Sequence, residues 1–262
     1  MMQSGDTDPA YSCLLYIAAR FDITLEQRYW LAFLYSTCYC GPTAYYMFNE
    51  FPDYHLVDFD RMERWWKANR DKVIFTTDKA WVRSRNQFVD MVRSYTKVVG
   101  HEEQAMKYFE LKTSDKFQTY NNCYKEFSNC YQMGRFGLFL YLEAVHELTS
   151  YPISPTGLDL KNAVSSRNGL CYALDRDDLI RHKDKTPLDN KTLAMLDKEF
   201  WQLFNEIKKD RPDDTTVWSV ETTLCAYKKY KLGKRYIGYY IERQRKEIEK
   251  IENKVTDGVD WS

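Results

Sequence analysis

Residues 39–53 place a Gly-Pro break, an amide and two carboxylates close together. The Gly-Pro pair predicts a sharp turn, at which glycine lets the backbone approach a ligand closely. Farther along, an asparagine could pair with an amide-like base edge, and a carboxylate could serve as a general base. A capping and turn cluster at a helix end is the competing interpretation. The candidate residues are Tyr39, Gly41, Pro42, Asn49, Glu50 and Asp53.

A second stretch, residues 77–86, adds two cations and an indole. Lys79 and Arg83 are four residues apart and would share one face of a helix. Two cations near a helix start suit a phosphate or pyrophosphate group, although a solvated basic face is the alternative. Trp81 could stack on an extruded base or only anchor the helix. The candidates here are Asp78, Lys79, Trp81 and Arg83.

Two further stretches carry arginines that are candidate anion ligands. Arg135 stands at the predicted start of a helix, and Arg167 lies in a predicted loop with the turn pair Asn168-Gly169. Glu143 is eight residues beyond Arg135, about two helical turns, so both could face one cleft. An internal ion pair is the competing interpretation of each charged residue.

Between positions 228 and 243, six cations are interspersed with tyrosines. This pattern is typical of a surface that follows a nucleic-acid backbone and stacks on its bases. A charged, partly buried surface helix is the alternative. The predicted DNA-binding residues are Lys228, Lys229, Lys231, Lys234 and Arg235.

Helical periodicity dominates the elements that must position these residues, so we expect a mostly α-helical protein. Thr24 and Gln27 predict a capping box, and Gly41-Pro42 should end one helix and open the next. Thr186-Pro187 predicts another helix start. The last helix carries an isoleucine stripe, which would dock on the body or form a homodimer contact. Further helices are expected near 58–70, 80–98, 114–131, 135–149, 187–209 and 235–254.

We expect one domain spanning residues 1–262. Tyr151–Gly157 contains two prolines and a glycine and is the clearest break in the chain. It could be a domain boundary or a rigid loop within one domain. Val73–Thr77 is a short β-branched run that could be extended.

The composition narrows the function classes. Thirty-eight Lys and Arg balance 38 Asp and Glu, which argues against a general nucleic-acid coat protein but allows a local basic groove. Seven irregularly spaced cysteines favour free thiols in a reducing compartment. We expect a soluble, cytoplasmic protein without a membrane span. No zinc, phosphate-loop or serine-nucleophile motif is complete, so no metal site is expected.

Four motifs give the chain a family resemblance. Residues 49–53 read Asn-Glu-Phe-Pro-Asp, residues 77–81 Thr-Asp-Lys-Ala-Trp, residues 134–136 Gly-Arg-Phe and residues 167–170 Arg-Asn-Gly-Leu. Together they resemble the bacteriophage amino acid:DNA transferases, relatives of the α-glutamyl/putrescinyl thymine pyrophosphorylases. The resemblance extends over about residues 25–243 and departs from the family pattern after Trp81. It allows a helical DNA-glycosylase-like architecture.

The resemblance implies a substitution at the 5-methylene carbon of a thymine-like base in phage DNA, a step of thymidine hypermodification and restriction evasion. A kinase first phosphorylates or pyrophosphorylates 5-hydroxymethyluracil, and the transferase replaces that group with the α-amine of an amino acid such as glycine or serine. The implied partners are double-stranded DNA carrying this base and a free amino acid. No cofactor is implied, although Mg²⁺ could assist, and the setting would be the cytoplasm of an infected bacterium.

Roles for individual residues follow from the same resemblance. Asp53 or Glu50 would be the general base that keeps the amine unprotonated. Aromatic side chains would hold a flipped base. Lys79, Arg83 and Arg135 would contact the leaving group, Asn49 and Asn168 would orient base or amino acid, and Arg167 would take the amino acid's carboxylate.

Three alternatives remain open at this stage. A sister enzyme would attach a polyamine or glutamate. A helical DNA glycosylase-like enzyme would cleave the glycosidic bond. A non-catalytic DNA-binding or assembly protein would give no modified product.

Overall fold

A computed structural model of the chain describes residues 8–76, 85–101, 103–181 and 187–252. Within these ranges the regular elements are helices and there is no β-strand, so the predicted mostly α-helical class is confirmed. None of the described helices is both long and apolar enough to cross a membrane. The α-helices are α1 (Pro9–Arg20), α2 (Leu25–Cys38), α3 (Gly41–Glu50), α4 (Phe59–Asn69), α6 (Phe88–Val99), α7 (Gln104–Leu111), α8 (Lys116–Phe127), α9 (Arg135–Thr149), α10 (Val164–Ala173), α11 (Asn190–Asp210), α12 (Val217–Lys231) and α13 (Tyr239–Glu252), with 3-10 turns η2 (Tyr54–Leu56) and η4 (Asp177–Leu179).

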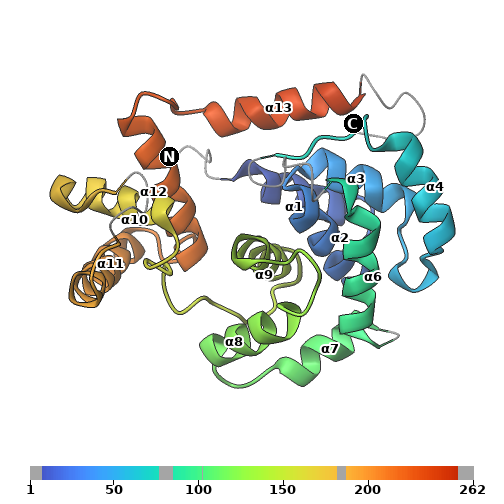
Figure 1. The fold of residues 1–262 in the computed structure, drawn as a ribbon, viewed down its shortest axis with the longest axis horizontal. Coiled ribbons are helices and arrows are strands. Elements are labelled where there is room, and N and C mark those ends of the chain that lie inside the picture. The colour runs from blue at the N-terminus through green and yellow to red at the C-terminus, as the bar shows by residue number, and fades with distance from the viewer. Residues whose placement is uncertain (1–7, 77–84, 102, 182–186, 253–262) are drawn as a thin grey trace. The chain divides into compact units, whose positions relative to one another are not determined.

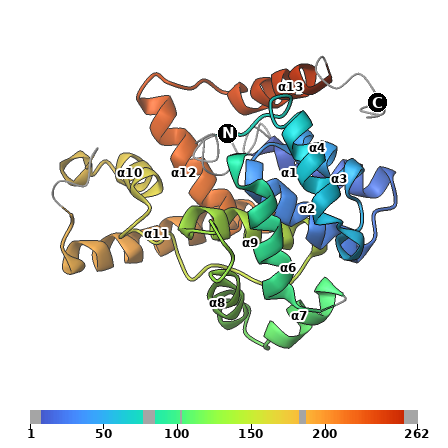
Figure 2. The same cartoon turned by 45° about the vertical axis from the view of Figure 1, so that its right-hand side comes forward.

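The residues group into two compact units. One contains Ala10–Ile153 and the residues from Arg243 onward, and we call it the α2 unit. The other contains Ser154–Glu242 and the residues up to Pro9, and we call it the α10 unit. The division after Ile153 lies within the Pro- and Gly-rich segment 151–157. Figure 1 shows the helices of each unit, and Figure 2 shows them from a second direction.

The α2 unit is built around a helix that is buried on every side. Ten consecutive residues of α2, from Tyr29 to Cys38, are buried, because α9 and α3 both pack on this helix. The predicted capping box is present: the Gln27 amide donates to the Thr24 hydroxyl, and the Thr24 amide donates to the Gln27 side chain. Much of the core is aromatic, including the stacked rings of Phe33 and Tyr95, whose centroids are 3.9 Å apart.

Three tyrosine hydroxyls form a chain inside the α2 unit. Tyr141 contacts both Tyr95, at 2.9 Å between the oxygens, and Tyr108. Burial raises the pKa of each of these phenols well above its ordinary value. The chain satisfies three hydroxyls that would otherwise be buried without partners.

The α10 unit has a smaller apolar core. Leu170, Leu196 and Phe200 are completely buried there. At Gly169 the backbone of α10 meets the backbone of α12 so closely that a Cβ atom would lie 2.1 Å from the Leu224 carbonyl oxygen. Glycine is therefore required at this helix crossing.

Several predicted element boundaries are corrected by the structure. Arg167, Asn168 and Gly169 lie in α10 and are buried, so the predicted loop and turn pair are wrong. The helix expected from 187 begins at Asn190, because Asp189 caps it by accepting from the Thr192 amide. The C-terminal helix begins at Tyr239 instead of residue 235. The sequence prediction also missed α1, α7, α10 and α12.

Candidate functional site

The connection between α2 and α3 is held in an unusual backbone conformation at Tyr39. Tyr39 ends α2 with φ 51° and ψ 43°, in the left-handed region, and its N–H donates to the Tyr35 carbonyl across 2.7 Å. A bulky residue there costs about 1–3 kcal/mol, and such outliers concentrate at functional sites. Pro42 follows in the first turn of α3, as the sequence predicts.

The chain that leads into the second motif is fastened to this connection. The Thr76 amide donates to the Cys38 carbonyl at 3.0 Å, and the Thr76 hydroxyl donates to the Tyr39 carbonyl. Thr43, in the first turn of α3, exchanges two hydrogen bonds with the backbone of Ile74 at 2.9 and 3.0 Å. Two stretches more than thirty residues apart in sequence are thus joined.

The start of α9 also packs against Tyr39. The ring of Phe136 packs edge-on against the ring of Tyr39, with centroids 6.0 Å apart. Arg135, half-buried, is the first residue of α9 and follows Gly134, which has no side chain with which to cap the helix. A helix start of this kind, next to an arginine, favours an anionic group.

Residues from the C-terminal helix complete the cluster. The Arg243 guanidinium lies 5.9 Å from the centroid of the Tyr39 ring, and its Nε pairs with Glu247 at 2.7 Å. The Gln244 amide lies against Gly41, 3.4 Å from where a Cβ atom would be. Burial raises the pKa of the neighbouring Cys40 thiol to about 12, and the Glu247 carboxylate adds to that rise.

We call this cluster the Tyr39 junction. Sequence reasoning missed its C-terminal residues, although Arg243 and Glu247 are spaced four apart, as paired charges on a helix are. Their ion pair is mostly buried, whereas the Arg245–Glu249 pair on the same helix is exposed. The junction consists of Tyr39, Cys40, Gly41, Thr76, Arg135, Phe136, Arg243 and Glu247.

The predicted carboxylates lie at the other end of α3. Glu50 pairs with Arg61, while Asp53 accepts from the His55 amide at 2.9 Å and so caps η2. Asn49 is exposed near the end of α3. The ten residues of α3 span about 15 Å, so the structure separates these residues from the Tyr39 junction.

A cavity of about 690 Å³ opens beside Asp53. Sequence reasoning missed it, because its two histidines, His55 and His101, are far apart in the chain. His101 also contacts Glu110 at 3.1 Å. The lining residues are Tyr54, His55, Val57, Phe59, Thr96, Gly100, His101 and Glu103.

The next candidates belong to the second stretch, residues 77–86. Asp78, Lys79, Trp81 and Arg83 lie outside the described residues. The described neighbours on either side are fixed: Thr76 at the junction, and Arg85, whose carbonyl accepts from the Trp66 indole at 2.9 Å.

Glu143, Arg167 and Asn168 are all buried. Glu143 is in the middle of α9, two turns from Arg135. In the α10 unit, Arg167 donates to the Leu160 carbonyl at 2.9 Å. Asn168 holds the backbone of Arg181 with bonds of 2.7 and 3.2 Å. Arg167 and Asn168 therefore bond to backbone groups and stabilise the fold of the α10 unit.

The predicted DNA-binding cations gather in the α10 unit at the end of α12. Lys228 is half-buried and donates to the Ser165 hydroxyl at 2.7 Å, and burial lowers its pKa. Lys231 and Lys234 are exposed. The Arg235 guanidinium stacks 3.7 Å above the Tyr239 ring. Cations in the last turn of a helix also stabilise its dipole, which is the structural alternative.

Neither a reactive thiol nor a metal centre is evident among the described residues. All seven cysteines are free, and burial raises the pKa of Cys123 and Cys130 to about 12, which keeps them protonated. No described group of three His, Cys, Asp or Glu side chains could hold a metal ion.

Comparisons with known proteins agree with the family resemblance. A family model described as amino acid:DNA transferase matches residues 2–236. A serinyltransferase from Salmonella phage ViI is 26% identical over 247 residues, which is 87% of this chain. The chain spans 59% of that relative's length. No solved structure matches the chain.

Proposed function

Since the chain belongs to the amino acid:DNA transferase family, we propose that it transfers an amino acid onto phosphorylated or pyrophosphorylated 5-hydroxymethyluracil in phage DNA. The α-amine of the amino acid forms a bond to the 5-methylene carbon. The bond from that carbon to the phosphate oxygen breaks, and phosphate or pyrophosphate leaves with the electron pair. The surplus proton of the amine passes to a carboxylate or to solvent. Glycine and serine are the proposed amino acids, and the reaction takes place in the cytoplasm of the infected host.

One observation supports placing this reaction at the Tyr39 junction. One of the four family motifs, through Phe136, and the residue just before another, Thr76, meet the Tyr39 turn there, together with Arg243 from the C-terminal helix. Departing phosphate carries growing negative charge, and arginine pairs with phosphate oxygens through two parallel hydrogen bonds. We assign Arg135 and Arg243 to the leaving group.

The ion pair at Arg243 prepares its guanidinium for this role. Glu247 takes the Nε–H and thereby fixes the plane of the guanidinium before substrate arrives. Because the pair is largely withdrawn from water, Arg243 loses less entropy on binding phosphate than an exposed arginine would. Glu247 is a positioning residue in this scheme.

The length of α3 bears on which residues can act as the general base of a reaction at the Tyr39 junction. An amine and the group it displaces react at one carbon, so their binding groups must lie within a few ångströms of each other. Glu50 and Asp53 are engaged with Arg61 and η2 about one length of α3 away. We therefore assign them to supporting the fold of this end of α3.

Nucleoside mass spectrometry tests the proposal directly. Duplex DNA that carries phosphorylated or pyrophosphorylated 5-hydroxymethyluracil is incubated with the protein and mixed amino acids, then digested to nucleosides. We expect a nucleoside whose mass has increased by one amino acid less water relative to 5-hydroxymethyl-2′-deoxyuridine. Unchanged nucleosides with the phosphorylated base present, and with polyamines also tried, would overturn the transferase assignment. Free base released instead would indicate a glycosylase.

A further inference from the structure

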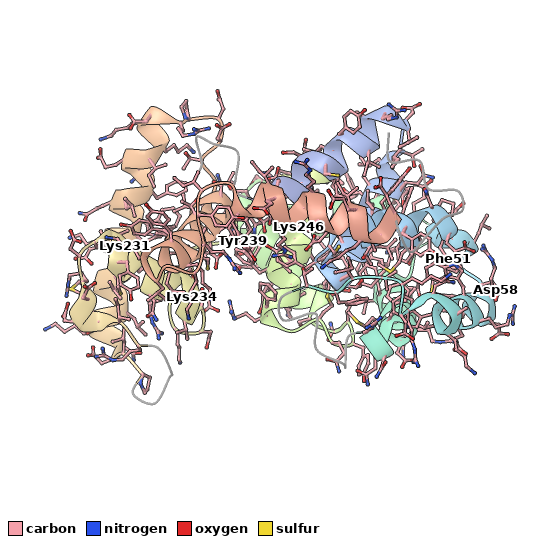
Figure 3. The ribbon with its side chains drawn as sticks, turned by 90° about the horizontal axis from the view of Figure 1, so that it is seen from above. Phe51, Asp58, Lys231, Lys234, Tyr239 and Lys246 are labelled. Carbon is pink, nitrogen blue, oxygen red and sulfur yellow. The ribbon has the colours of Figure 1, made fainter. Side chains whose placement is uncertain are left out.

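The connection between α12 and α13 exposes large apolar side chains among cations. Tyr236 is 51% exposed and Ile237 59% exposed, and Leu232 and Ile241 are also exposed. In the same segment Lys231 and Lys234 are exposed. Figure 3 labels Lys231, Lys234 and Tyr239, which come from the end of α12, the connection and the start of α13. Exposed apolar side chains grouped in this way indicate an interaction surface.

The connection contains two turns, each with a glycine. Gly233 and Gly238 both have positive φ, 66° and 99°. The Gly233 amide donates to the Tyr230 carbonyl at 2.9 Å, which closes α12. The Tyr239 amide donates to the Tyr236 carbonyl at 3.2 Å. Ile237 is therefore an inner, exposed residue of the four-residue turn that this second bond closes.

The rings around Ile237 are held in place. The Tyr236 hydroxyl bonds to Glu242, and its ring packs edge-on against Tyr239 with centroids 5.7 Å apart. The Arg235 guanidinium carbon lies 3.7 Å from the centroid of the Tyr239 ring. Aromatic rings fixed beside an exposed aliphatic side chain can stack on nucleobases with little loss of entropy.

Charge decides between the two partners that this surface could accept. A symmetric dimer would bring the same patch of two copies together, so Lys231, Lys234 and Arg235 would face their own copies and repel. Polyanionic DNA complements them instead. Three acids lie close to this segment: Asp175 and Asp177 act on Lys231, and Glu242 is bonded to Tyr236. Of the groups named, Lys234 and Arg235 keep no carboxylate partner in these contacts and are the cations that DNA phosphates would meet.

We propose that Ile237, supported by Tyr236, is a wedge that enters the base stack of duplex DNA while Lys231 and Lys234 bind the flanking phosphates. Apolar side chains inserted at a base step unstack it and release a base from the helix. The wedge rests on the proposed function in one respect: it opens the duplex so that the modified pyrimidine can be reached.

The fluorescence of 2-aminopurine placed next to the modified base reports unstacking of the bases, and it does so independently of amino-acid transfer. We expect the wild-type protein to raise this fluorescence several-fold at saturation. Ile237→Ser should abolish the rise but weaken DNA binding by less than about fivefold, because phosphate contacts carry most of the affinity. Lys231→Gln and Lys234→Gln should each reduce the slope of log K against log salt by about 0.9.

Leu56→Ser is the matched control, because Leu56 is 78% exposed in the other unit. It should behave as the wild type does. A full fluorescence rise with Ile237→Ser would overturn the wedge even if modified nucleoside is formed. A dimer that Ile237→Ser converts to monomer would also overturn it and assign the surface to a second copy. A wild-type rise without modified nucleoside would leave the wedge standing and remove the transferase assignment.

Discussion

The backbone amide of Thr76 lies 3.0 Å from the carbonyl oxygen of Cys38 and donates a hydrogen bond to it. The Thr76 hydroxyl continues this contact to the next carbonyl, that of Tyr39. These bonds attach the residue just before the 77–81 motif to the connection between α2 and α3, at the point where the backbone of Tyr39 is strained. The attachment is the basis for placing the chemistry at the Tyr39 junction.

Thr76→Val should slow transfer more than it weakens the fold. The valine removes the hydroxyl bond to Tyr39 and leaves the amide bond to Cys38. We expect about 1 kcal/mol of lost stability and a fall in kcat of about tenfold to a hundredfold, since small displacements at a reacting centre are costly. Single-turnover transfer and urea unfolding measure the two effects. Thr223→Val is the control, because that hydroxyl bonds within its own helix at 2.7 Å. Equal kcat in both variants would contradict the role of the attachment.

Arg243→Ala should reduce kcat by about 10²–10³, the usual effect of removing one group that stabilises developing charge. Glu247→Gln should have a smaller effect, because it leaves the guanidinium but loosens its orientation. Affinity for unmodified DNA should not change. Arg245→Ala removes an exposed arginine of the same helix and should leave transfer intact. If the Arg243 and Arg245 variants have the same rate, Arg243 does not contact the leaving group.

Asp53→Asn tests which end of α3 holds the chemistry. Asparagine caps a helix start about as well as aspartate, so the bond to the His55 amide survives while the carboxylate is lost. We expect near-normal stability and near-normal transfer at all accessible pH values. A loss of transfer with unchanged unfolding would return the general base to Asp53 and move the reaction to the cavity beside it.

Gly169→Ala should destabilise the α10 unit by several kcal/mol, because its Cβ would lie 2.1 Å and 2.6 Å from backbone atoms of Leu224. Overpacking of this kind usually costs about 1–3 kcal/mol, and backbone atoms cannot move aside as a side chain can. Gly134→Ala is the control, since nothing lies within 4 Å of the position of its Cβ. Denaturant unfolding of both variants gives the comparison. Equal midpoints would show that α10 and α12 do not cross as closely as described.

Stability should fall at alkaline pH. The phenols of Tyr95, Tyr108 and Tyr141 have a raised pKa in the fold, so they stay protonated after the unfolded chain begins to ionise near pH ~10. Their contribution is fully present below pH ~10 and is lost as the pH rises above it, because the unfolded state then binds fewer protons. Urea unfolding between pH 8 and about 11, with ionisation followed by absorbance, measures the slope. Tyr141→Phe should make it shallower, and a slope unchanged by that substitution would assign the effect to other groups.

Several helix boundaries of this protein could be predicted from the sequence alone, because they depend on local interactions. The capping box at Thr24 and Gln27 and the helix start at Gly41-Pro42 depend on neighbours within a few residues, and sequence shows such signals directly. The family motifs are also local, and they identified the transferase family. Tertiary structure decided which distant segments meet: Tyr39 contacts Thr76, Phe136 and Arg243.

Burial was the other property that sequence could not supply. Arg167 and Asn168 have the residue types of a ligand site, yet their hydrogen bonds go to backbone groups inside the α10 unit. Asp53 has the residue type of a base, yet it caps a turn one helix length from the Tyr39 junction. A side chain's type states which bonds it can form, but packing between distant segments determines which partners come within range, and that depends on the whole chain.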